Sequence, residues 1–298
     1  MATIREYLGL GEFYITNVCN MACQNCNRFN DVARKGHIKF NEEQYIEFAT
    51  RFDLGVISII GGEPLLHPGL LSYVKGLRKL WPTSDLIITS NGMQLNKVKH
   101  LYEYCVANRC SLEISFHDED DLDKRLWNEI EIFKKQNGFS WNAVQDEVLE
   151  HTGRDGEKFT TTAQHLTDEG GFKFLFTDAH TFSTTNVREY DGMTPLPHDS
   201  DPAKAYHDCS LKFSHTFFNG DLYKCGFIAA AKEFVTERNA EHLWKPLYDY
   251  KPVNMKQWDS QWRDKFFSPE DVCRVCSERA NYGKCKTWLK KEYEKDNT

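Results

Sequence analysis

The fold of this chain is constrained most by a regular alternation of short apolar runs with longer amphipathic segments. The apolar runs have the length and β-branched character of buried strands, and they lie at residues 12–17, 56–60, 85–89 and 111–117. Helical segments follow them at residues 42–52, 68–80, 95–106 and 121–136. Strands that alternate with helices through short connections favour a parallel sheet with right-handed crossovers. The sequence therefore predicts an α/β domain.

The rest of the chain carries weaker signals for secondary structure. A fifth strand is predicted near residues 139–144 and a sixth at 172–176, whereas residues 145–171 show no clear pattern. Residues 183–208 are rich in proline, aspartate and histidine, which is typical of a linker or of a loop over a site. We therefore expect three parts, namely an α/β domain, a linker and a cysteine-rich domain, over residues 1–180, 181–208 and 209–298.

Each of the four predicted strands ends in a polar or glycine-rich motif. These motifs are the cysteine loop from Cys19 to Cys26, Gly61-Gly62-Glu63-Pro64, Ser90-Asn91-Gly92 and Ser115-Phe116-His117. In parallel α/β folds, ligands bind at the carboxyl ends of the strands. We therefore expect all four motifs to face one ligand-binding cavity.

Cys19, Cys23 and Cys26 form a C-x3-C-x2-C triad in the first of these loops. Iron–sulfur clusters are held by cysteine thiolates, and a cubane normally takes four of them. Three thiolates would leave one iron open to a small molecule, which would make the cluster a reaction centre. A zinc site that takes a fourth ligand from elsewhere in the chain is the alternative.

Charge and composition narrow the functional classes. The formal net charge of −7 argues against general binding to nucleic acids or anionic membranes, for which a basic excess is typical. The sequence has neither an apolar segment approaching the roughly 20 residues of a membrane span nor a secretory signal. We therefore expect a cytoplasmic protein whose ten cysteines are reduced and favour metal ligation over disulfides. Cys105 and Cys110 are predicted to be core residues.

The cysteine triad and the motif Gly61-Gly62-Glu63-Pro64 together resemble the radical S-adenosylmethionine (radical SAM) superfamily. The resemblance spans about residues 10–180 and implies a partial (β/α)6 TIM-like barrel of radical SAM type. It also implies a 4Fe–4S cluster whose open iron binds the amino and carboxylate groups of S-adenosylmethionine. The residues that it implies in cofactor binding are Gly61, Gly62, Glu63, Pro64, Ser90, Asn91 and Ser115. The family usually has an aromatic residue before the third cysteine, where this chain has Asn25, and Phe29 is a candidate substitute.

A second group of cysteines lies in the C-terminal third of the chain, at Cys209, Cys225, Cys273, Cys276 and Cys285. Asn219-Gly220, between two apolar runs, predicts a hairpin turn just before Cys225. Two distant cysteines and the C-x2-C pair Cys273–Cys276 can close on one metal centre. A zinc ribbon and an iron–sulfur cluster both fit this spacing.

Beside a radical SAM domain, this spacing looks like the small C-terminal twitch domain of that superfamily, which is a half-size SPASM domain. The resemblance implies an auxiliary 4Fe–4S cluster, the second in the chain, on Cys209, Cys225, Cys273 and Cys276. Cys285 is left over as a buried thiol, an alternative ligand or a hydrogen-atom donor. An electron donor such as flavodoxin or ferredoxin is the expected protein partner.

The resemblance implies an enzyme that cleaves S-adenosylmethionine reductively to a 5′-deoxyadenosyl radical, which abstracts hydrogen from a substrate. An auxiliary cluster that accepts an electron favours net oxidation of a small hydroxylated metabolite. Only about 11 residues precede the first strand, so we expect no N-terminal leader-binding domain, which favours a small molecule over a peptide. The alternatives are a radical epimerase with Cys285 or Cys110 as hydrogen donor, an enzyme that modifies ribosomally made peptides, and a non-catalytic zinc-binding scaffold.

Overall fold

The computed structural model describes most of the 298 residues. The described ranges are 5–23, 26–29, 36–117, 120–138, 145–152, 158–168, 172–178, 181–183, 189–191, 194–253, 258–278, 282–284 and 287–289. The chain divides into two compact units, of which the first comprises residues 1–20 and 34–180 and the second residues 21–33 and 181–298. The segment 21–33, which carries Cys23 and Cys26, thus groups with the C-terminal part of the chain. The three-part division expected from the sequence stays a prediction.

The first unit is built on parallel strands that follow one another across a sheet in chain order. β1 (Glu6–Tyr14) pairs with β3 (Phe52–Ile60), β3 with β4 (Asp85–Ser90), β4 with β5 (Cys110–Phe116), and β5 with β8 (Lys173–Asp178). The predicted α/β architecture with a parallel sheet is therefore confirmed, and it is consistent with the predicted partial barrel. β8 is the strand predicted at residues 172–176.

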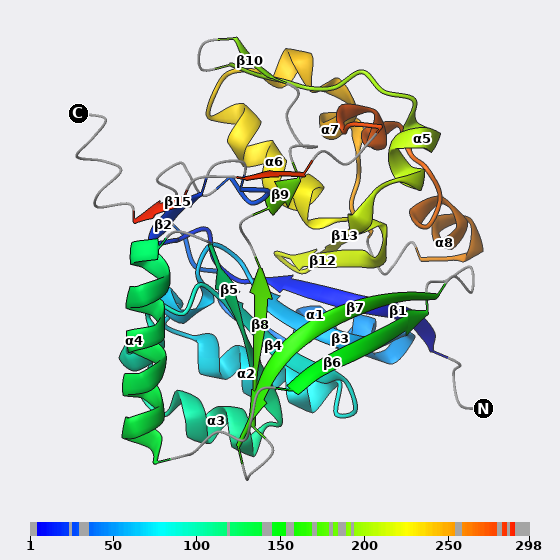
Figure 1. The fold of residues 1–298 in the computed structure, drawn as a ribbon. Coiled ribbons are helices and arrows are strands. Elements are labelled where there is room, and N and C mark those ends of the chain that lie inside the picture. The colour runs from blue at the N-terminus through cyan, green and yellow to red at the C-terminus, as the bar shows by residue number, and fades with distance from the viewer. Residues whose placement is uncertain are drawn as a thin grey trace. The chain divides into compact units, whose positions relative to one another are not determined.

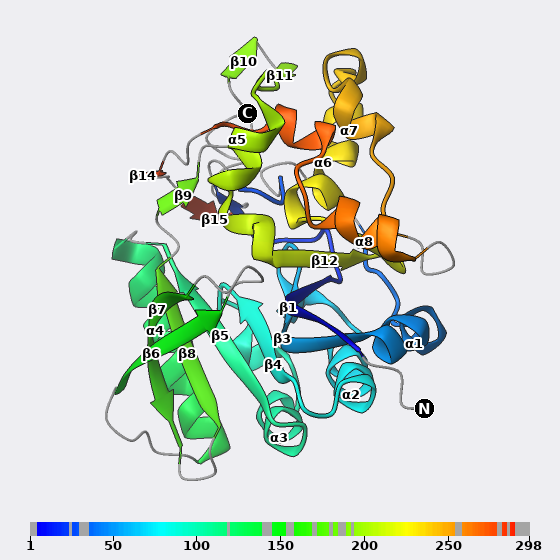
Figure 2. The same ribbon diagram turned by 90° about the vertical axis from the view of Figure 1, so that its right-hand side faces the viewer.

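A helix follows each of the first four parallel strands, and these helices lie along one face of the sheet (Figures 1 and 2). They are α1 (Glu42–Arg51), α2 (Leu70–Leu80), α3 (Leu101–Ala107) and α4 (Asp120–Asn137). Side chains alternate between the two faces of a strand, and the apolar residues Leu86, Ile88, Leu112 and Ile114 are buried on the helical side. The residues that alternate with these along each strand, such as Thr89, lie on the opposite face.

Two parts of the first unit depart from the predicted elements. The helix predicted at 95–106 forms as a 3-10 turn at Leu95–Lys97 followed by α3, because His100 has a φ of 61°, which an α-helix does not contain. The region 145–167 forms an antiparallel pair of β6 (Gln145–Thr152) with β7 (Lys158–Thr167), and β7 pairs antiparallel with β8. Threonines supply much of the strand propensity of β7, so no apolar run marks it. The strand predicted at 139–144 lies outside the described residues.

The second unit consists of short elements. Asn219 and Gly220 form the turn between β12 (Ser214–Phe218) and β13 (Asp221–Tyr223), with φ of 52° and 83°. The predicted Asn-Gly hairpin turn is confirmed, since positive φ at both central residues is what these residue types allow. The helices are α5 (Pro202–His207), α6 (Gly226–Thr236), α7 (Lys245–Asp249) and α8 (Ser260–Phe266). Antiparallel pairs join β2 (Met21–Cys23) to β15 (Thr287–Leu289), β9 (Thr181–Ser183) to β14 (Tyr282–Lys284), and β10 (Glu189–Asp191) to β11 (Thr194–Leu196).

Helix α6 supplies much of the hydrophobic core of the second unit. Its residues Phe227 and Phe234 are buried together with Trp244 and Val272. Phe29 joins this core, because its ring stacks on the ring of Phe234 with a centroid distance of 4.0 Å. The aromatic residue considered above as a cofactor contact is thus packed in the core of the second unit.

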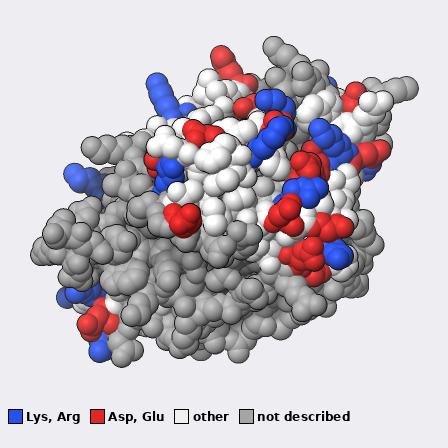
Figure 3. Space-filling model, turned by 90° about the horizontal axis from the view of Figure 1, so that it is seen from above, with Lys and Arg blue, Asp and Glu red and all other residues white. Residues whose placement is uncertain are grey.

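The described surface carries charges of both signs. On the face shown in Figure 3, basic and acidic side chains are interspersed over the described part of the chain. Arg274, for example, forms ion pairs of 3.1 Å with both Asp199 and Asp271. Among the helices that the structure describes, none has the length and apolar character needed to cross a membrane.

Candidate functional site

The segment that leads from β1 to the first cysteines runs beside the end of β3. Its backbone carbonyls accept hydrogen bonds from the strand-end motif, with Gly62 N donating to Thr16 O (2.6 Å) and Glu63 N to Val18 O (2.7 Å). A Cβ atom on Gly61 would come within 2.6 Å of Thr16 O, and one on Gly62 would overlap Val18 O. Both glycines are therefore needed where two stretches of backbone approach each other closely. The same hypothetical Cβ on Gly62 would lie 3.1 Å from Cys19 Cβ, which places Cys19 against this motif.

Glu63 is completely buried and joins the ends of β3 and β4. Its Oε1 accepts hydrogen bonds from Leu65 N (2.9 Å) and Ser90 Oγ (2.8 Å), and its Oε2 accepts one from Asn91 N (2.8 Å). Burial raises the pKa of Glu63 to about 7, although the three hydrogen bonds favour the charged form. Glu63 therefore holds two strand-end motifs together, and its predicted contact with the cofactor stays a prediction. Pro64 follows as the first residue of the 3-10 turn Pro64–Leu66, which Glu63 caps.

Asn91 extends this network to the first cysteine loop. Its Nδ2 donates to Asn20 Oδ1 (2.9 Å), and Asn20 directly follows Cys19. Its Oδ1 accepts a hydrogen bond from Met93 N (3.1 Å), and Ser90 Oγ accepts one from Gly92 N (2.9 Å). The motifs after β1, β3 and β4 are thus joined by direct hydrogen bonds. Asn20 was missed at the sequence level, where only its place beside Cys19 could have drawn attention to it.

The fourth motif lies at the end of β5, next to β4. Ser115 is half-buried and lies opposite Thr177 of β8, in register. His117 is buried, and burial lowers its pKa to about 4, so the ring is neutral at pH 7. The described hydrogen bonds of Glu63 do not include Ser115, so the structure places this residue beside the network without joining it.

A polar row crosses the face of the sheet opposite the helices. Ser58 Oγ lies 2.8 Å from Thr89 Oγ1, and Thr89 Oγ1 donates to Glu113 Oε2 at 2.6 Å. Glu12 lies opposite Ser58 in the register of β1 and β3. Burial is the main cause that raises the pKa of Glu113, and repulsion from Glu12 raises it further. No specific signal in the sequence marks this row, because its members are single polar residues in separate strands. Hydroxyl and carboxyl groups in such a row suit a ligand that carries hydroxyl groups.

The cysteine triad is described in two parts, because Cys19 belongs to the first unit and Cys23 and Cys26 belong to the second. Cys23 ends β2 and lies opposite Thr287 of β15. Cys26 N donates to Cys23 O (3.3 Å), so the two cysteines of the second unit lie in one turn. This turn presents two thiols of the predicted cluster from a single short segment, which fits a cluster ligand loop.

Four cysteines of the second group come together in the second unit. Cys209, Cys225, Cys273 and Cys276 interact electrostatically in every pairwise combination. Burial is the main cause that raises the pKa of each of these thiols, that of Cys225 to about 12. Repulsion from neighbouring cysteines raises the pKa of Cys209, Cys225 and Cys276 further. Four buried thiolates would repel one another strongly, and a cationic iron–sulfur core would remove that cost. The four residues therefore fit the predicted auxiliary cluster in chemistry and burial.

Among the described residues, no group of three or more His, Cys, Asp or Glu side chains is arranged to hold a single metal ion. In a cubane each thiolate binds a different iron, so the sulfurs need not surround one centre. Cys285 lies outside the described residues, and none of the nine described cysteines forms a disulfide.

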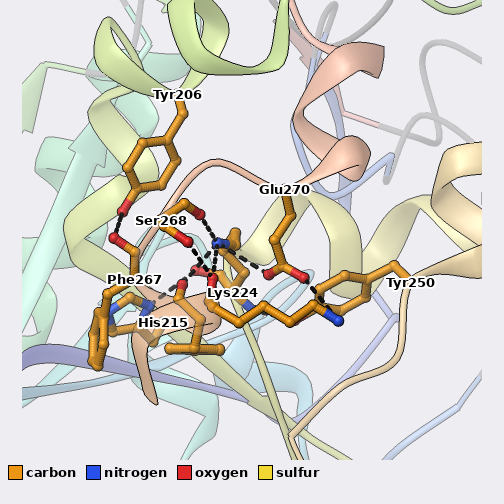
Figure 4. Close-up of polar contacts among 9 residues, drawn as sticks. Tyr206, His215, Lys224, Tyr250, Phe267, Ser268 and Glu270 are labelled. Atoms are coloured by element: carbon orange, nitrogen blue, oxygen red, sulfur yellow. Dashed lines mark hydrogen bonds and ion pairs between the residues drawn. The ribbon is translucent and has the colours of Figure 1, made fainter. Parts of the chain in front are cut away.

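A buried lysine ties together the two stretches of chain that carry Cys225 and Cys273 (Figure 4). Lys224 Nζ donates to the carbonyl oxygens of Phe266 (2.7 Å) and Ser268 (2.5 Å) and forms an ion pair of 3.0 Å with Glu270. Glu270 O in turn accepts a hydrogen bond from Cys273 N (2.9 Å). Lys224 thus holds the hairpin end before Cys225 to the loop before Cys273. Sequence reasoning missed Lys224, since a lysine beside a turn is usually exposed.

Known proteins resemble this chain over part of its length. No family model matches the chain. A GTP 3′,8-cyclase from Alkaliphilus metalliredigens is 29% identical over 116 residues, which are 38% of this chain and 36% of that enzyme. A GTP 3′,8-cyclase from Sulfurovum sp. is 36% identical over 86 residues, which are 27% of this chain and 26% of that enzyme. The chain thus spans about a third or less of the length of these relatives.

Two solved structures resemble the chain over most of its length. BtrN in complex with AdoMet and 2-DOIA aligns over 94% of this chain and 98% of its own, with a TM-score of 0.45 and 14% identity. Streptococcus suis SuiB bound to the precursor peptide SuiA aligns over 93% of this chain and 71% of its own, with a TM-score of 0.35 and 10% identity.

The parallel sheet with cysteine and glycine motifs at its strand ends defines the class of protein to which the chain is similar. The resemblance to radical SAM enzymes, which the triad and Gly61-Gly62-Glu63-Pro64 predicted, is confirmed by these relatives. Over the matched stretch the chain is a relative of the GTP 3′,8-cyclases. This relationship implies a 4Fe–4S cluster and the binding of S-adenosylmethionine.

Proposed function

We propose that this protein is a radical SAM enzyme that oxidises a small hydroxylated metabolite by net dehydrogenation. The observation that carries the proposal is the hydrogen-bonded network at the carboxyl ends of β1, β3 and β4. In it Gly62 lies against Cys19, and Glu63 binds Ser90 and Asn91. This arrangement supports one cofactor site at the edge where ligands of parallel sheets bind.

The residues around Cys19 would bind and orient the cofactor. A reduced 4Fe–4S cluster would supply the electron that splits S-adenosylmethionine into methionine and a 5′-deoxyadenosyl radical, which takes a hydrogen atom from the substrate. The glycine backbone at 61–62 can approach a ligand closely because it has no side chains. Glu63 fixes the positions of Ser90 and Asn91, so that this strand end is already ordered when the ligand binds.

The second cysteine group would receive the electron that remains after hydrogen abstraction. Loss of one electron and one proton from a carbinol radical gives a carbonyl group, so the balance requires a one-electron acceptor. Cys209, Cys225, Cys273 and Cys276 would hold an auxiliary 4Fe–4S cluster in that role, within a twitch-like domain. Their mutual proximity and burial support this part of the proposal.

The polar row on the sheet supports a hydroxylated substrate. Ser58, Thr89 and Glu113 form a chain of hydrogen-bonding groups on the face opposite the helices. Hydroxyl groups of a substrate can donate to the Glu113 carboxylate and to the Ser58 hydroxyl oxygen. Epimerisation, peptide modification and a zinc-binding scaffold are the outcomes that the test below must separate from dehydrogenation.

The test is anaerobic reconstitution followed by addition of S-adenosylmethionine and dithionite. We expect about eight iron atoms, as two cubanes, and release of 5′-deoxyadenosine. The protein is then incubated with a cell extract whose metabolites are deuterated, and deuterium should appear in 5′-deoxyadenosine. Mass spectrometry of the extract identifies a product that has lost two hydrogens relative to its precursor. A product in which one deuterium has been replaced by hydrogen would indicate epimerisation, and a modified peptide would indicate the peptide alternative. Zinc at both cysteine groups without cleavage would refute the enzyme. Cys105→Ala, which removes a buried thiol outside both groups, should keep the full iron content.

A further inference from the structure

A buried arginine of the second unit follows the cysteines of the first group. Arg28 lies two residues after Cys26, and only 4% of its surface is exposed. A Cβ atom on Gly226 would overlap the Arg28 guanidinium, with Nη1, Cζ and Nη2 as its nearest neighbours. The guanidinium therefore lies directly against the backbone of Gly226, the residue after Cys225.

Arg28 and helix α6 supply a positive charge and an N–H donor that act on Cys225. Arg28 interacts electrostatically with the Cys225 thiol and favours its thiolate form, against the larger effect of burial. The backbone N–H of Ile228, in the first turn of α6, donates to the same sulfur. A buried guanidinium is costly unless an opposite charge lies near it. Four thiolates with an iron–sulfur core carry a net negative charge, which would supply that opposite charge.

We propose that Arg28 is the counter-charge of the second cysteine group and that it raises the reduction potential of the cluster held there. The inference rests on the auxiliary cluster of the proposed function and deepens it. Net charge, hydrogen bonds and exposure set the potential of a cluster, and a nearby fixed cation stabilises the reduced, more negative form. Arg28 thus makes the cluster a better acceptor for the electron that dehydrogenation releases.

Gly226 is the residue that makes room for this charge. Its φ lies outside the left-handed region, and it is the first residue of α6, where alanine is tolerated well. Gly226→Ala should therefore leave the helix intact and displace the guanidinium. The effects of Gly226→Ala and of a substitution at Arg28 are coupled, since the added methyl group can act on the potential only where the arginine is present.

The experiment is a redox titration monitored by EPR. It uses the reconstituted protein in a Cys19→Ala background. Cys19 belongs to the first unit, so this substitution removes the first cluster and leaves the segment that carries Arg28 unaltered. Arg28→Met should lower the equilibrium constant for reduction of the remaining cluster about tenfold. This corresponds to a reduction potential that is lower by about 59 mV for one electron. Arg28→Lys should keep most of the wild-type potential. Gly226→Ala should shift the potential in the same direction as Arg28→Met and should add nothing to it in the double variant.

Arg274→Met is the matched control. Arg274 lies between Cys273 and Cys276 in sequence, but its guanidinium is exposed and paired with Asp199 and Asp271. Water and these partners screen its charge, so its loss should shift the potential much less than the loss of Arg28.

Different results overturn different parts of the account. If the Cys19→Ala protein binds no iron–sulfur cluster, the auxiliary cluster fails and Arg28 has no such role. If the cluster forms and Arg28→Met shifts the potential no more than Arg274→Met, the role of Arg28 is refuted and the auxiliary cluster stands. If Arg28→Lys shifts as far as Arg28→Met, packing rather than charge is responsible, which also refutes the proposal. If the Arg28→Met protein does not bind the cluster, the potentials of Arg28→Lys and Gly226→Ala test the proposal instead. A wild-type potential in Gly226→Ala would then refute the role of Arg28.

Discussion

The two cysteine groups lie in contrasting surroundings. Cys19 of the first group lies against Gly62, among backbone carbonyls and the polar network of Glu63, Ser90 and Asn91. In the second group, Cys225 lies in the hydrophobic core of its unit and Cys273 and Cys276 pack against that core, with Lys224 and Arg28 as buried basic side chains of the same unit. The first group has three thiols and polar neighbours, whereas four of the five cysteines of the second group come together in a unit with buried cations.

Under the proposed function, this contrast distinguishes a site that binds a molecule from a site that holds a charged cluster. Three thiols leave a coordination position open, and glycines and polar strand ends allow a ligand to approach it. Four thiols close a cluster, and buried cations then act on its potential instead of on a ligand. We expect substitutions in the two groups to affect different steps of the reaction.

The largest expected effect comes from removing one cysteine of each group. Cys23→Ala should abolish release of 5′-deoxyadenosine, because no intact first cluster can form. Cys276→Ala should keep that release and abolish formation of the oxidised product, because the electron acceptor is lost. Both activities are measured by liquid chromatography with mass spectrometry. Full product formation by Cys276→Ala would remove the distinction between the two groups.

A large effect on stability is expected for Lys224→Met. The substitution leaves the Glu270 carboxylate and two carbonyl oxygens without their buried partner, and breaking a buried pair costs about 3–5 kcal/mol. The free energy of unfolding from urea denaturation and the iron content of the second group should both fall. Lys245→Met, which breaks the exposed pair with Asp249, serves as control and should lower the free energy of unfolding much less. Equal stability of the two variants would show that Lys224 does not hold the second group together.

An intermediate effect is expected from the pH dependence of Glu63. Its pKa is raised from 4.5 to about 7, so the folded protein binds a proton more tightly than the unfolded chain does. The contribution of Glu63 to stability is therefore fully present below pH 4.5 and is lost as the pH rises through 7. Relative to Glu63→Gln, the free energy of unfolding should fall by up to about 3 kcal/mol between these values. A difference that is constant with pH, measured by urea denaturation, would contradict the burial of this carboxyl.

The smallest effect is expected for Ser90→Ala. The substitution removes one of the three donors to Glu63, which should cost about 1 kcal/mol and weaken binding of S-adenosylmethionine several-fold. Ser115→Ala is the matched control, because Ser115 lies at the neighbouring strand end outside the hydrogen bonds of Glu63. Calorimetric binding constants measure the difference. A stronger effect of Ser115→Ala would move the cofactor site toward β5.

Several elements of both units could be predicted from the sequence, because local patterns decide them. The β-branched run Val56–Ile60 and the Asn219-Gly220 turn each carry their own signal, and both form as expected. β6 and β7 could not be predicted, since polar strands owe their conformation to pairing with β8. Within the site, the motifs were visible as spacings, but Lys224 and Arg28 were not. Their burial depends on carbonyls and cysteines distant in sequence, which no local pattern reveals.

The distinction between the two cysteine groups is tested most directly by EPR of the reduced protein with and without S-adenosylmethionine. The spectra should be recorded for Cys276→Ala, which keeps the first cluster, and for Cys19→Ala, which keeps the second. The account predicts that S-adenosylmethionine changes the spectrum of Cys276→Ala and leaves that of Cys19→Ala unchanged. A changed spectrum in Cys19→Ala, or no effect in Cys276→Ala, would contradict it.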